Sequence, residues 1–461
     1  MSTVFDFNGA SGSGWSQPDS NFQNPDAVPE SLRRKRLPGW PRASEPELVR
    51  HYTLLSQKTF GIDTGFYPLG SCTMKHNPRV NERIVQLPGI DRIHPLQDSS
   101  QVQGLLAIYY EMQEMLAICS GMDAVTLQPV AGAQGEFTAI RCIQEYHRSR
   151  GDDHRDKVIV PDSAHGTNPA SASMCGYQII EIPSASDGRL DIDALRAAVG
   201  DDTAAMMITN PSTMGLFETN IAEASQIVHE AGGQMYYDGA NFNAIIGKTD
   251  PGRMGFDAVH YNLHKTFSQP HGGGGPGSGP IGVKDHLSEF LPTPIASRRE
   301  AQEGEPNGVG DGFYYFWQDV GDNSIGKVQQ WNGNAGAVVR AWAFYRRYGR
   351  DLERMSEHAV LNSNYLRHKI MNPEPDVAAK INCMPSEGSE ASLVMHEFTL
   401  SMSPVKEVNG VTGKDVAKRL LDYGYMSPTL YFPQIVPECL MIEPTETESK
   451  EVLDKFAADF H

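Results

Sequence analysis

Long apolar runs are missing from this sequence. No stretch of about 18 consecutive apolar residues occurs, so we expect no transmembrane helix. The first residues, MSTVFDF, contain no basic region followed by an apolar run, and this argues against a signal peptide. They also lack the arginine-rich character of an organelle transit peptide. The cytoplasm is therefore the expected location.

Cysteine is scarce and dispersed. The six cysteines are Cys72, Cys119, Cys142, Cys175, Cys383 and Cys439. They form no C-x-x-C pair and no cluster, so we expect neither a disulfide framework nor a zinc site, and a reducing compartment fits best. Cys72 is the exception to watch, because it lies in the unusual stretch Gly70–Lys75, whereas the others read as small core residues.

Basic residues are fewer than acidic ones. Lys and Arg number 39 against 57 Asp and Glu, which gives a formal net charge of -18. An acidic chain repels phosphate backbones and anionic lipid, so nucleic acid and membrane surfaces are not expected as main partners. Solubility is the simplest explanation of the charge. The glycine-containing turn at 132–136 matches neither the Walker nor the Rossmann pattern.

The length and texture of the chain suggest three regions. With 461 residues, the chain is too long for one small core. Residues 1–85 read as an N-terminal arm that needs another surface to lie on, with a disordered tail as the alternative for the first part. Residues 86–330 predict a large domain, and residues 331–461 predict a smaller α+β domain.

Strands and helices alternate through the large domain. Short apolar runs predict strands at 124–130, 158–160, 179–182, 204–209, 234–237 and 258–262. Helical spacing predicts helices at 101–119, 134–146, 192–199 and 221–231, and a long basic helix at 338–354 in the small domain. Further strands are expected near 392–400 and 439–442, with helices near 414–423 and 448–456. The alternation indicates an α/β fold with a mostly parallel sheet covered on both faces by helices.

Polar residues gather where the predicted strands end. In open parallel sheets, ligands bind beyond the carboxyl ends of the strands. Five polar residues occupy such positions, namely Gln134, His165, Asn210, Asp238 and Lys265. We therefore expect them to meet in one site.

Lys265 lies in the most unusual segment of the chain. It follows an apolar strand, is flanked by His264 and Thr266, and leads into the glycine-rich run 272–279. Crowding and desolvation promote the loss of the ammonium proton that makes a lysine nucleophilic. A solvated surface lysine is the ordinary alternative, but this context favours a lysine that holds pyridoxal phosphate (PLP) as a Schiff base.

Other strand ends suggest contacts for the same cofactor. Asp238 is placed to pair with a pyridinium nitrogen, although a helix cap or turn would also explain it. His165 is placed to stack on a flat ring, with a capping or core histidine as the alternative. Asn210 is placed to reach the phenolic oxygen, with a simple turn as the alternative. The turn Gly132–Glu136 between a strand and a helix suits a phosphate group, although such glycine-rich turns are common.

Four segments in this order carry a resemblance to a known family. They are 66–75 (FYPLGSCTMK), 128–136 (QPVAGAQGE), 162–170 (DSAHGTNPA) and 264–265 with the glycine-rich tail. The chain resembles fold-type-I PLP enzymes. More narrowly, it resembles the glycine decarboxylase (P-protein) of the glycine cleavage system over roughly residues 30–460. The length and the intact lysine match the second (β) subunit of the two-subunit form.

The resemblance implies a reaction and a partner. Glycine joined to PLP loses CO2, and the aminomethyl group passes to the lipoyl arm of H-protein. A homologous α subunit in an α2β2 assembly is implied, and no metal is. Lys265 holds the cofactor and moves protons, Asp238 pairs with the ring nitrogen and His165 stacks on the ring.

Further roles remain weaker expectations. Ala133, Gln134 and Thr266 are candidates for binding the phosphate, in that order. His264 is a second candidate for proton transfer, and Cys72 could face the entering dithiol.

Two other readings stay open. The first is another fold-type-I PLP enzyme, such as an amino-acid decarboxylase or lyase; a desulfurase would need a mobile catalytic cysteine, which no loop shows. The second is a non-catalytic scaffold subunit, against which Lys265 and Asp238 argue.

Many aminotransferases of this fold bind the substrate carboxylate with an arginine, and the tail segment 427–436 contains none. An enzyme that expels CO2 gains little from a strong ground-state clamp.

Overall fold

The computed structural model divides the chain into two compact units, Met1–Thr64 and Gly65–His461. The residues that it describes are 3–7, 28–33, 43–272, 277–306, 308–378, 383–387 and 393–461. The boundary between the units lies inside the predicted arm of residues 1–85. In the first unit, helix α1 (Glu45–Ser56) begins with a capping box between Ser44 and Glu47. Among the described residues before it are the short 3-10 turns η1 (Val4–Asp6) and η3 (Glu30–Leu32).

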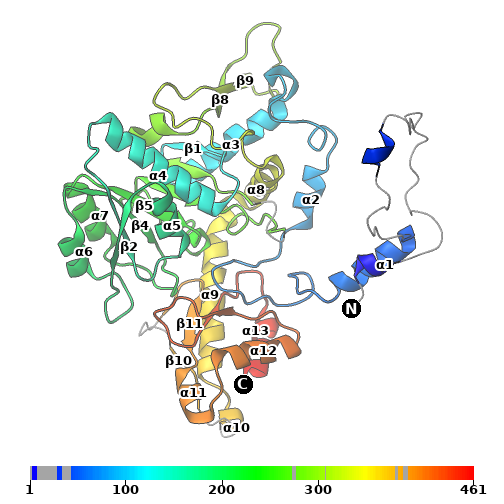
Figure 1. Ribbon diagram of the computed structural model, residues 1–461, viewed down its shortest axis with the longest axis vertical. Coiled ribbons are helices and arrows are strands. Elements are labelled where there is room, and N and C mark those ends of the chain that lie inside the picture. The colour runs from blue at the N-terminus through cyan, green and yellow to red at the C-terminus, as the bar shows by residue number, and fades with distance from the viewer. Residues whose placement is uncertain are drawn as a thin grey trace. The chain divides into compact units, whose positions relative to one another are not determined.

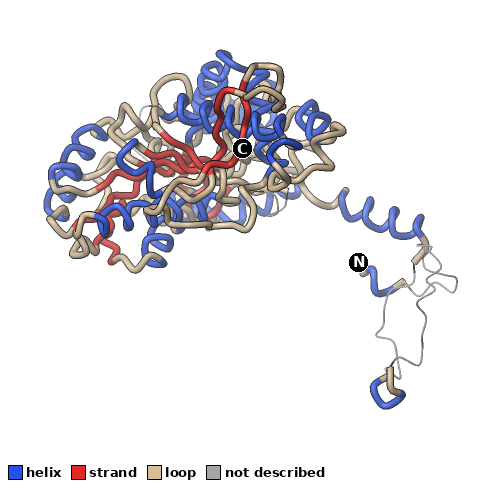
Figure 2. The backbone as a smooth tube through the Cα atoms, turned by 90° about the horizontal axis from the view of Figure 1, so that it is seen from above, coloured by secondary structure: helices blue, strands red, loops and turns tan. Residues whose placement is uncertain are grey.

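A seven-stranded sheet forms the centre of the second unit (Figures 1 and 2). Its strands are β1 (Ala124–Thr126), β2 (Lys157–Pro161), β3 (Gln178–Ile182), β4 (Thr203–Thr209), β5 (Gln234–Gly239), β6 (Ala258–Tyr261) and β7 (Ile281–Val283). The strand order is β1-β7-β6-β5-β4-β2-β3, and β7 alone runs antiparallel to its neighbours. The predicted α/β fold with a mostly parallel sheet is confirmed.

Both faces of this sheet are covered, which explains the continuous apolar runs in its strands. Every residue of β4 is buried. Neighbouring strand residues point to opposite faces, and Met206 and Met207 accordingly belong to two different core clusters. Helices α4 (Gly132–Ser149) and α5 (Thr167–Met174) cover the Met207 face. Helices α3 (Gln103–Ser120), α6 (Ile192–Ala198), α7 (Ile221–Glu230) and α8 (Ala335–Tyr348) cover the Met206 face.

The C-terminal part has its own small sheet and core. Strands β10 (Ser386–Glu387), β11 (Phe398–Ser401), β13 (Cys439–Ile442) and β12 (Thr429–Leu430) pair antiparallel in that order. Helices α9 (Leu352–Met371), α10 (Pro375–Ala378), α11 (Ser403–Asn409), α12 (Gly413–Asp422) and α13 (Lys450–Phe460) accompany the sheet. Phe66 packs into this core, so the segment after Gly65 is anchored to the small sheet.

Two expectations about single elements are wrong. The long helix expected over 338–354 is interrupted: α8 ends at Tyr348, Gly349 has φ of +51°, and α9 begins at Leu352. A glycine in this conformation ends a helix at little steric cost. Strand β3 is also less buried than its apolar run suggested, with only Ile182 fully buried, because β3 is an edge strand with one neighbour.

The remaining elements connect these layers. They are α2 (Arg79–Val85), the hairpin of β8 (Ile295–Glu300) and β9 (Phe313–Gln318), and the 3-10 turns η4 (Ser99–Gln101), η5 (Phe242–Ala244), η6 (Asp285–Phe290) and η7 (Gly349–Asp351). The six cysteines are free thiols. None of the helices within the described ranges is both long and apolar enough to cross a membrane.

We predict that Phe456→Ala destabilises the chain by about 3–5 kcal/mol, because it opens a cavity in the C-terminal core. Phe456 is fully buried and makes edge-on ring contacts with Phe66 at 4.9 Å and Tyr425 at 5.0 Å. Equilibrium urea unfolding followed by circular dichroism measures the loss. Tyr423→Ala is the matched control, since Tyr423 is 48% exposed. Equal free energies of unfolding for the two variants would show that this core does not carry stability.

Candidate active site

The predicted site residues meet at the carboxyl ends of the parallel strands, as the topology requires. Asp238 lies near the end of β5, and Lys265 lies in the turn that follows β6. His165 lies in the loop after β2, and Ala133 lies in the first turn of α4, which follows β1. Strands β5 and β6 are neighbours, so Asp238 and the lysine turn are brought close together.

Asp238 is a buried carboxylate. It is 2% exposed, its Oδ1 accepts the backbone N–H of Ala240 at 2.9 Å, and the Nε2 of His260 lies 3.6 Å from the same oxygen. Burial raises the pKa of Asp238, but His260, the Ala240 N–H, Lys265 and His165 outweigh it, and the net pKa is lowered. Asp238 is therefore ionised, which suits a partner for a protonated ring nitrogen.

Glu136 is a second acid beside Asp238, and its role was missed from the sequence. It projects from α4 and accepts hydrogen bonds from the hydroxyls of Thr167 at 2.7 Å and Ser171 at 3.3 Å. We assign the Asn168 amide so that its nitrogen donates to Glu136 at 2.9 Å and to Asp238 at 3.1 Å. Burial, followed by the charge of Asp238, raises the pKa of Glu136 to about 8. Glu136 thus keeps its proton while Asp238 loses its own. The motif at 132–136 contains Glu136, but nothing in the pattern placed it against Asp238.

His165 presents an accessible ring in the site. Its Nδ1 lies 2.9 Å from the hydroxyl of Thr167, and Phe432 contacts the ring edge-on at 5.5 Å. The surrounding protein atoms desolvate the imidazole and lower its pKa despite the attraction of Asp238. The ring is nevertheless exposed to solvent. A neutral, open ring is suited to stacking on a flat cofactor.

Lys265 is half-buried and surrounded by neutral imidazoles. Its Nζ donates to the carbonyl of Ser71 at 2.8 Å. Burial, followed by the charge of Lys265, lowers the pKa of His264 to about 3 and that of His271 to about 4. The Nδ1 of His264 accepts from the backbone N–H of Ser278 at 3.4 Å. His264 is therefore a neutral and weak base, and its role in proton transfer stays a prediction.

The start of α4 provides a cradle that suits a phosphate. The N–H groups of a first helical turn have no partner within the helix. A Cβ added to Gly132 would lie 2.5 Å from the side-chain oxygen of Asn262, so this helix start packs closely on the lysine turn. The Gln134 side chain is already bonded to the N–H of Val130 and the carbonyl of Val328, which leaves its backbone N–H as the available donor. Ala133 is exposed at the same turn.

Three other candidate residues, Thr266, Asn210 and Cys72, differ in their present hydrogen bonds and ionisation. The hydroxyl of Thr266 is buried and has no hydrogen-bond partner among the described residues, which leaves it available to a ligand. The Asn210 amide is hydrogen-bonded to the backbone of Glu218 at 3.0 and 3.4 Å. Its predicted contact with the cofactor would therefore require these hydrogen bonds to break. Burial raises the pKa of Cys72, so this side chain is a thiol rather than a thiolate at neutral pH.

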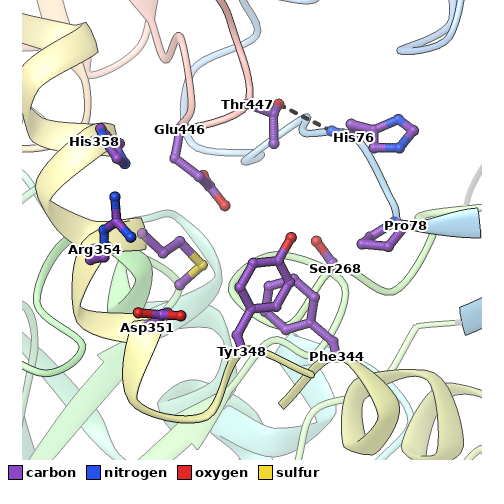
Figure 3. Close-up of a pocket in the computed structure, with 11 residues that line it drawn as sticks. His76, Pro78, Ser268, Phe344, Tyr348, Asp351, Arg354, His358, Glu446 and Thr447 are labelled. Atoms are coloured by element: carbon purple, nitrogen blue, oxygen red, sulfur yellow. Dashed lines mark hydrogen bonds between the residues drawn. The ribbon is translucent and has the colours of Figure 1, made fainter. Parts of the chain in front are cut away.

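A separate cavity lies beside the lysine turn (Figure 3). Its volume is about 490 Å³, and it is lined by His76, Pro78, Ser268, Phe344, Tyr348, Asp351, Arg354, Met355, His358, Glu446 and Thr447. Lys75 borders it, because its ammonium binds Glu446 at 2.7 Å and the carbonyl of Thr266 at 2.8 Å. Asp238, His165 and Lys265 do not line this cavity.

We predict that Glu136→Gln flattens the pH dependence of stability between pH 5 and 8. The folded pKa of about 8 lies above the ordinary value of 4.5, so the unfolded chain releases this proton first and wild-type stability falls as pH rises through that window. Glutamine cannot titrate, so the variant should gain on the order of 1–3 kcal/mol relative to wild type from pH 5 to pH 8. Urea unfolding at both pH values measures this difference. Parallel pH profiles would contradict the assignment of the proton to Glu136.

Comparisons with known proteins agree with this geometry. The family model described as glycine dehydrogenase, C-terminal domain, matches residues 355–460, and the aminotransferase class-V model matches residues 135–293. In solved structures, a glycine decarboxylase (P-protein) of the glycine cleavage system in inhibitor-bound form matches 95% of this chain and 93% of its own, with a TM-score of 0.73 and 16% identity. A NifS-like protein matches 86% of this chain and 98% of its own, with a TM-score of 0.61 and 16% identity. At such identities these structures show the fold alone.

Curated sequences are much closer. A probable glycine dehydrogenase (decarboxylating) subunit 2 from Thermococcus gammatolerans is 52% identical over 433 residues, which cover 93% of this chain and 82% of the relative. The protein of the same name from Halalkalibacterium halodurans is 52% identical over 430 residues, with 93% and 83% covered. The one from Methylococcus capsulatus is 50% identical, with 93% and 84% covered. With half of its residues shared over nearly its whole length, the chain belongs to the family of glycine dehydrogenase (decarboxylating) subunit 2, a family of PLP-dependent enzymes.

Proposed function

We propose that this chain decarboxylates glycine and passes the remaining aminomethyl group to the lipoyl group of H-protein, as a subunit of the glycine cleavage system. The observation that carries the proposal is the 52% identity to subunit 2 of glycine dehydrogenase over 93% of the chain. The ionised Asp238 and the half-buried Lys265 at the carboxyl ends of neighbouring strands support it.

Each residue has one task in this proposal. When bound, PLP supplies an electron sink that accepts the electron pair left by CO2. Lys265 holds the cofactor covalently at Nζ and takes or gives a proton when that amino group is free. Asp238 keeps the ring nitrogen protonated through its negative charge, and His165 covers one face of the ring. The backbone N–H groups of Ala133 and Gln134, with the hydroxyl of Thr266, bind the phosphate.

We also propose that the chain works with a partner. The curated relatives are named subunit 2, which implies a first subunit for those proteins. A homologous α subunit in an α2β2 assembly, together with lipoylated H-protein, is the set of partners that we expect here. The six free cysteines fit a reducing cytoplasm.

We predict that Lys265→Ala abolishes release of labelled CO2 from glycine, because the variant lacks the amino group that holds the cofactor in this proposal. Asp238→Asn should lower the rate on the order of 100-fold or more, because the neutral amide does not stabilise a protonated ring nitrogen. The assay combines the chain with PLP, glycine, lipoylated H-protein and the α subunit.

Lys248→Ala is the control, since Lys248 is an exposed lysine paired with Glu353 and Glu357 and should leave the rate unchanged. Borohydride reduction followed by peptide mapping locates the attached cofactor. A pyridoxyl group on another lysine, or full activity in Lys265→Ala, would refute the assignment.

A further inference from the structure

A strained turn lies against the amino group of Lys265. Ser71 and Thr73 both have positive φ, at 64° and 49°, which non-glycine residues adopt only when the surroundings hold them there. The carbonyl of Ser71 accepts from Lys265 Nζ at 2.8 Å. The turn Ser71–Thr73 therefore decides where this amino group points.

Two buried glutamates hold this turn from the C-terminal sheet. Glu397 Oε2 accepts the backbone N–H of Ser71 at 2.7 Å. Glu443 accepts the backbone N–H of Thr73 at 2.8 Å and its hydroxyl at 2.6 Å. Both glutamates are completely buried. Three hydrogen bonds from residues 71 and 73 end on these two side chains, so the contacts can maintain an unfavourable backbone conformation.

The small sheet places the two acids side by side. Glu397 precedes β11 and Glu443 follows β13, and the register pairs Phe398 with Ile442. The next residue outward on each strand is therefore one of the two glutamates. Their carboxylates project from the same end of the sheet toward the turn, which only a fixed antiparallel register can arrange.

The surroundings of the pair contain few other charges. Asn241 and Asn243 donate to the glutamates at 3.4 and 3.3 Å. Burial comes first in raising the pKa of both acids, and Lys265 opposes it. His396 lies 3.7 Å from Glu397 and 4.0 Å from Glu443, and burial lowers its pKa to about 3, so it is neutral. Within the turn itself, Cys72 has a titratable side chain, and burial raises the pKa of its thiol.

We propose that Glu397 and Glu443 are positioning residues for Lys265, holding the Ser71–Thr73 turn so that the Ser71 carbonyl orients the lysine amino group toward the cofactor. This inference rests on the proposed function, in which Lys265 carries PLP. The carbonyl holds the amino group before the cofactor is attached and again whenever a substrate amine displaces it. The C-terminal sheet thereby sets the reactivity of a lysine on the central sheet.

The test measures how fast the cofactor-free full chain captures added PLP at Lys265, by absorbance and by borohydride trapping with peptide mapping. Glu397→Ala removes the acceptor for the Ser71 N–H and should slow capture about tenfold or more, as the loss of a buried hydrogen bond implies. Glu397→Gln retains an acceptor oxygen and should stay within about threefold of wild type. Glu443→Ala and Glu443→Gln should behave as the same kind of pair.

Asp257→Ala is the matched control for general destabilisation. Asp257 is 7% exposed and accepts the backbone N–H of Met235 at 2.7 Å, at the opposite end of β5 from Asp238. This variant should lower the melting temperature, as Glu397→Ala should, but capture PLP at the wild-type rate.

Three outcomes would overturn the proposal: capture by Glu397→Ala at the wild-type rate, equal slowing by Glu397→Gln and Glu397→Ala, or equal slowing by Asp257→Ala. Capture needs neither glycine nor H-protein. A wild-type chain that captures PLP at Lys265 but does not decarboxylate glycine would therefore refute the proposed function alone, whereas a chain that does not capture PLP at Lys265 would refute both.

Discussion

The ionised carboxylate of Asp238 is the interaction on which the rest of the site depends. Burial alone would raise the pKa of this acid, so its charge must be maintained by the surroundings. The neighbouring acid Glu136 keeps its own proton, and Asn168 donates to both. Two like charges so close together in a buried site would be costly, and the shared arrangement avoids that cost by ionising only one.

Burial also determines the protonation of the histidines around this carboxylate. His260 and His264 are desolvated and neutral, with pKa values lowered to about 4 and about 3. His260 lies 3.6 Å from Asp238, and His264 accepts a hydrogen bond from the backbone N–H of Ser278. The amino group of Lys265 is then the basic group that faces the acids, and its position is determined by a turn that the C-terminal sheet holds.

Close backbone contacts join the two sheets at this point. A Cβ on Gly215 would lie 1.9 Å from the carbonyl oxygen of Glu397, so the loop after β4 can approach the C-terminal sheet only as glycine. A Cβ on Gly279 would lie 2.0 Å from the carbonyl oxygen of Ala131, where the segment before β7 passes the start of α4. Glu397 and the start of α4 are thus each approached by a backbone segment at a point that tolerates no side chain.

The sequence by itself determined the alternation of strands and helices, and with it the parallel sheet and the edge at which Asp238 and Lys265 meet. These features depend on local periodicity and on the rule that ligands bind at the carboxyl ends of parallel strands. Periodicity could not show that Gly349 divides one long helical pattern into α8 and α9, or that β3 is an edge strand.

Only the tertiary structure decided which acids share the site. Glu136 faces Asp238 from a helix about a hundred residues earlier in the chain, and Glu397 and Glu443 are brought together by the register of β11 and β13. Contacts between residues so far apart leave no local pattern in a single sequence. The protonation state of each acid follows from its burial and its neighbours, which exist only once the chain has folded.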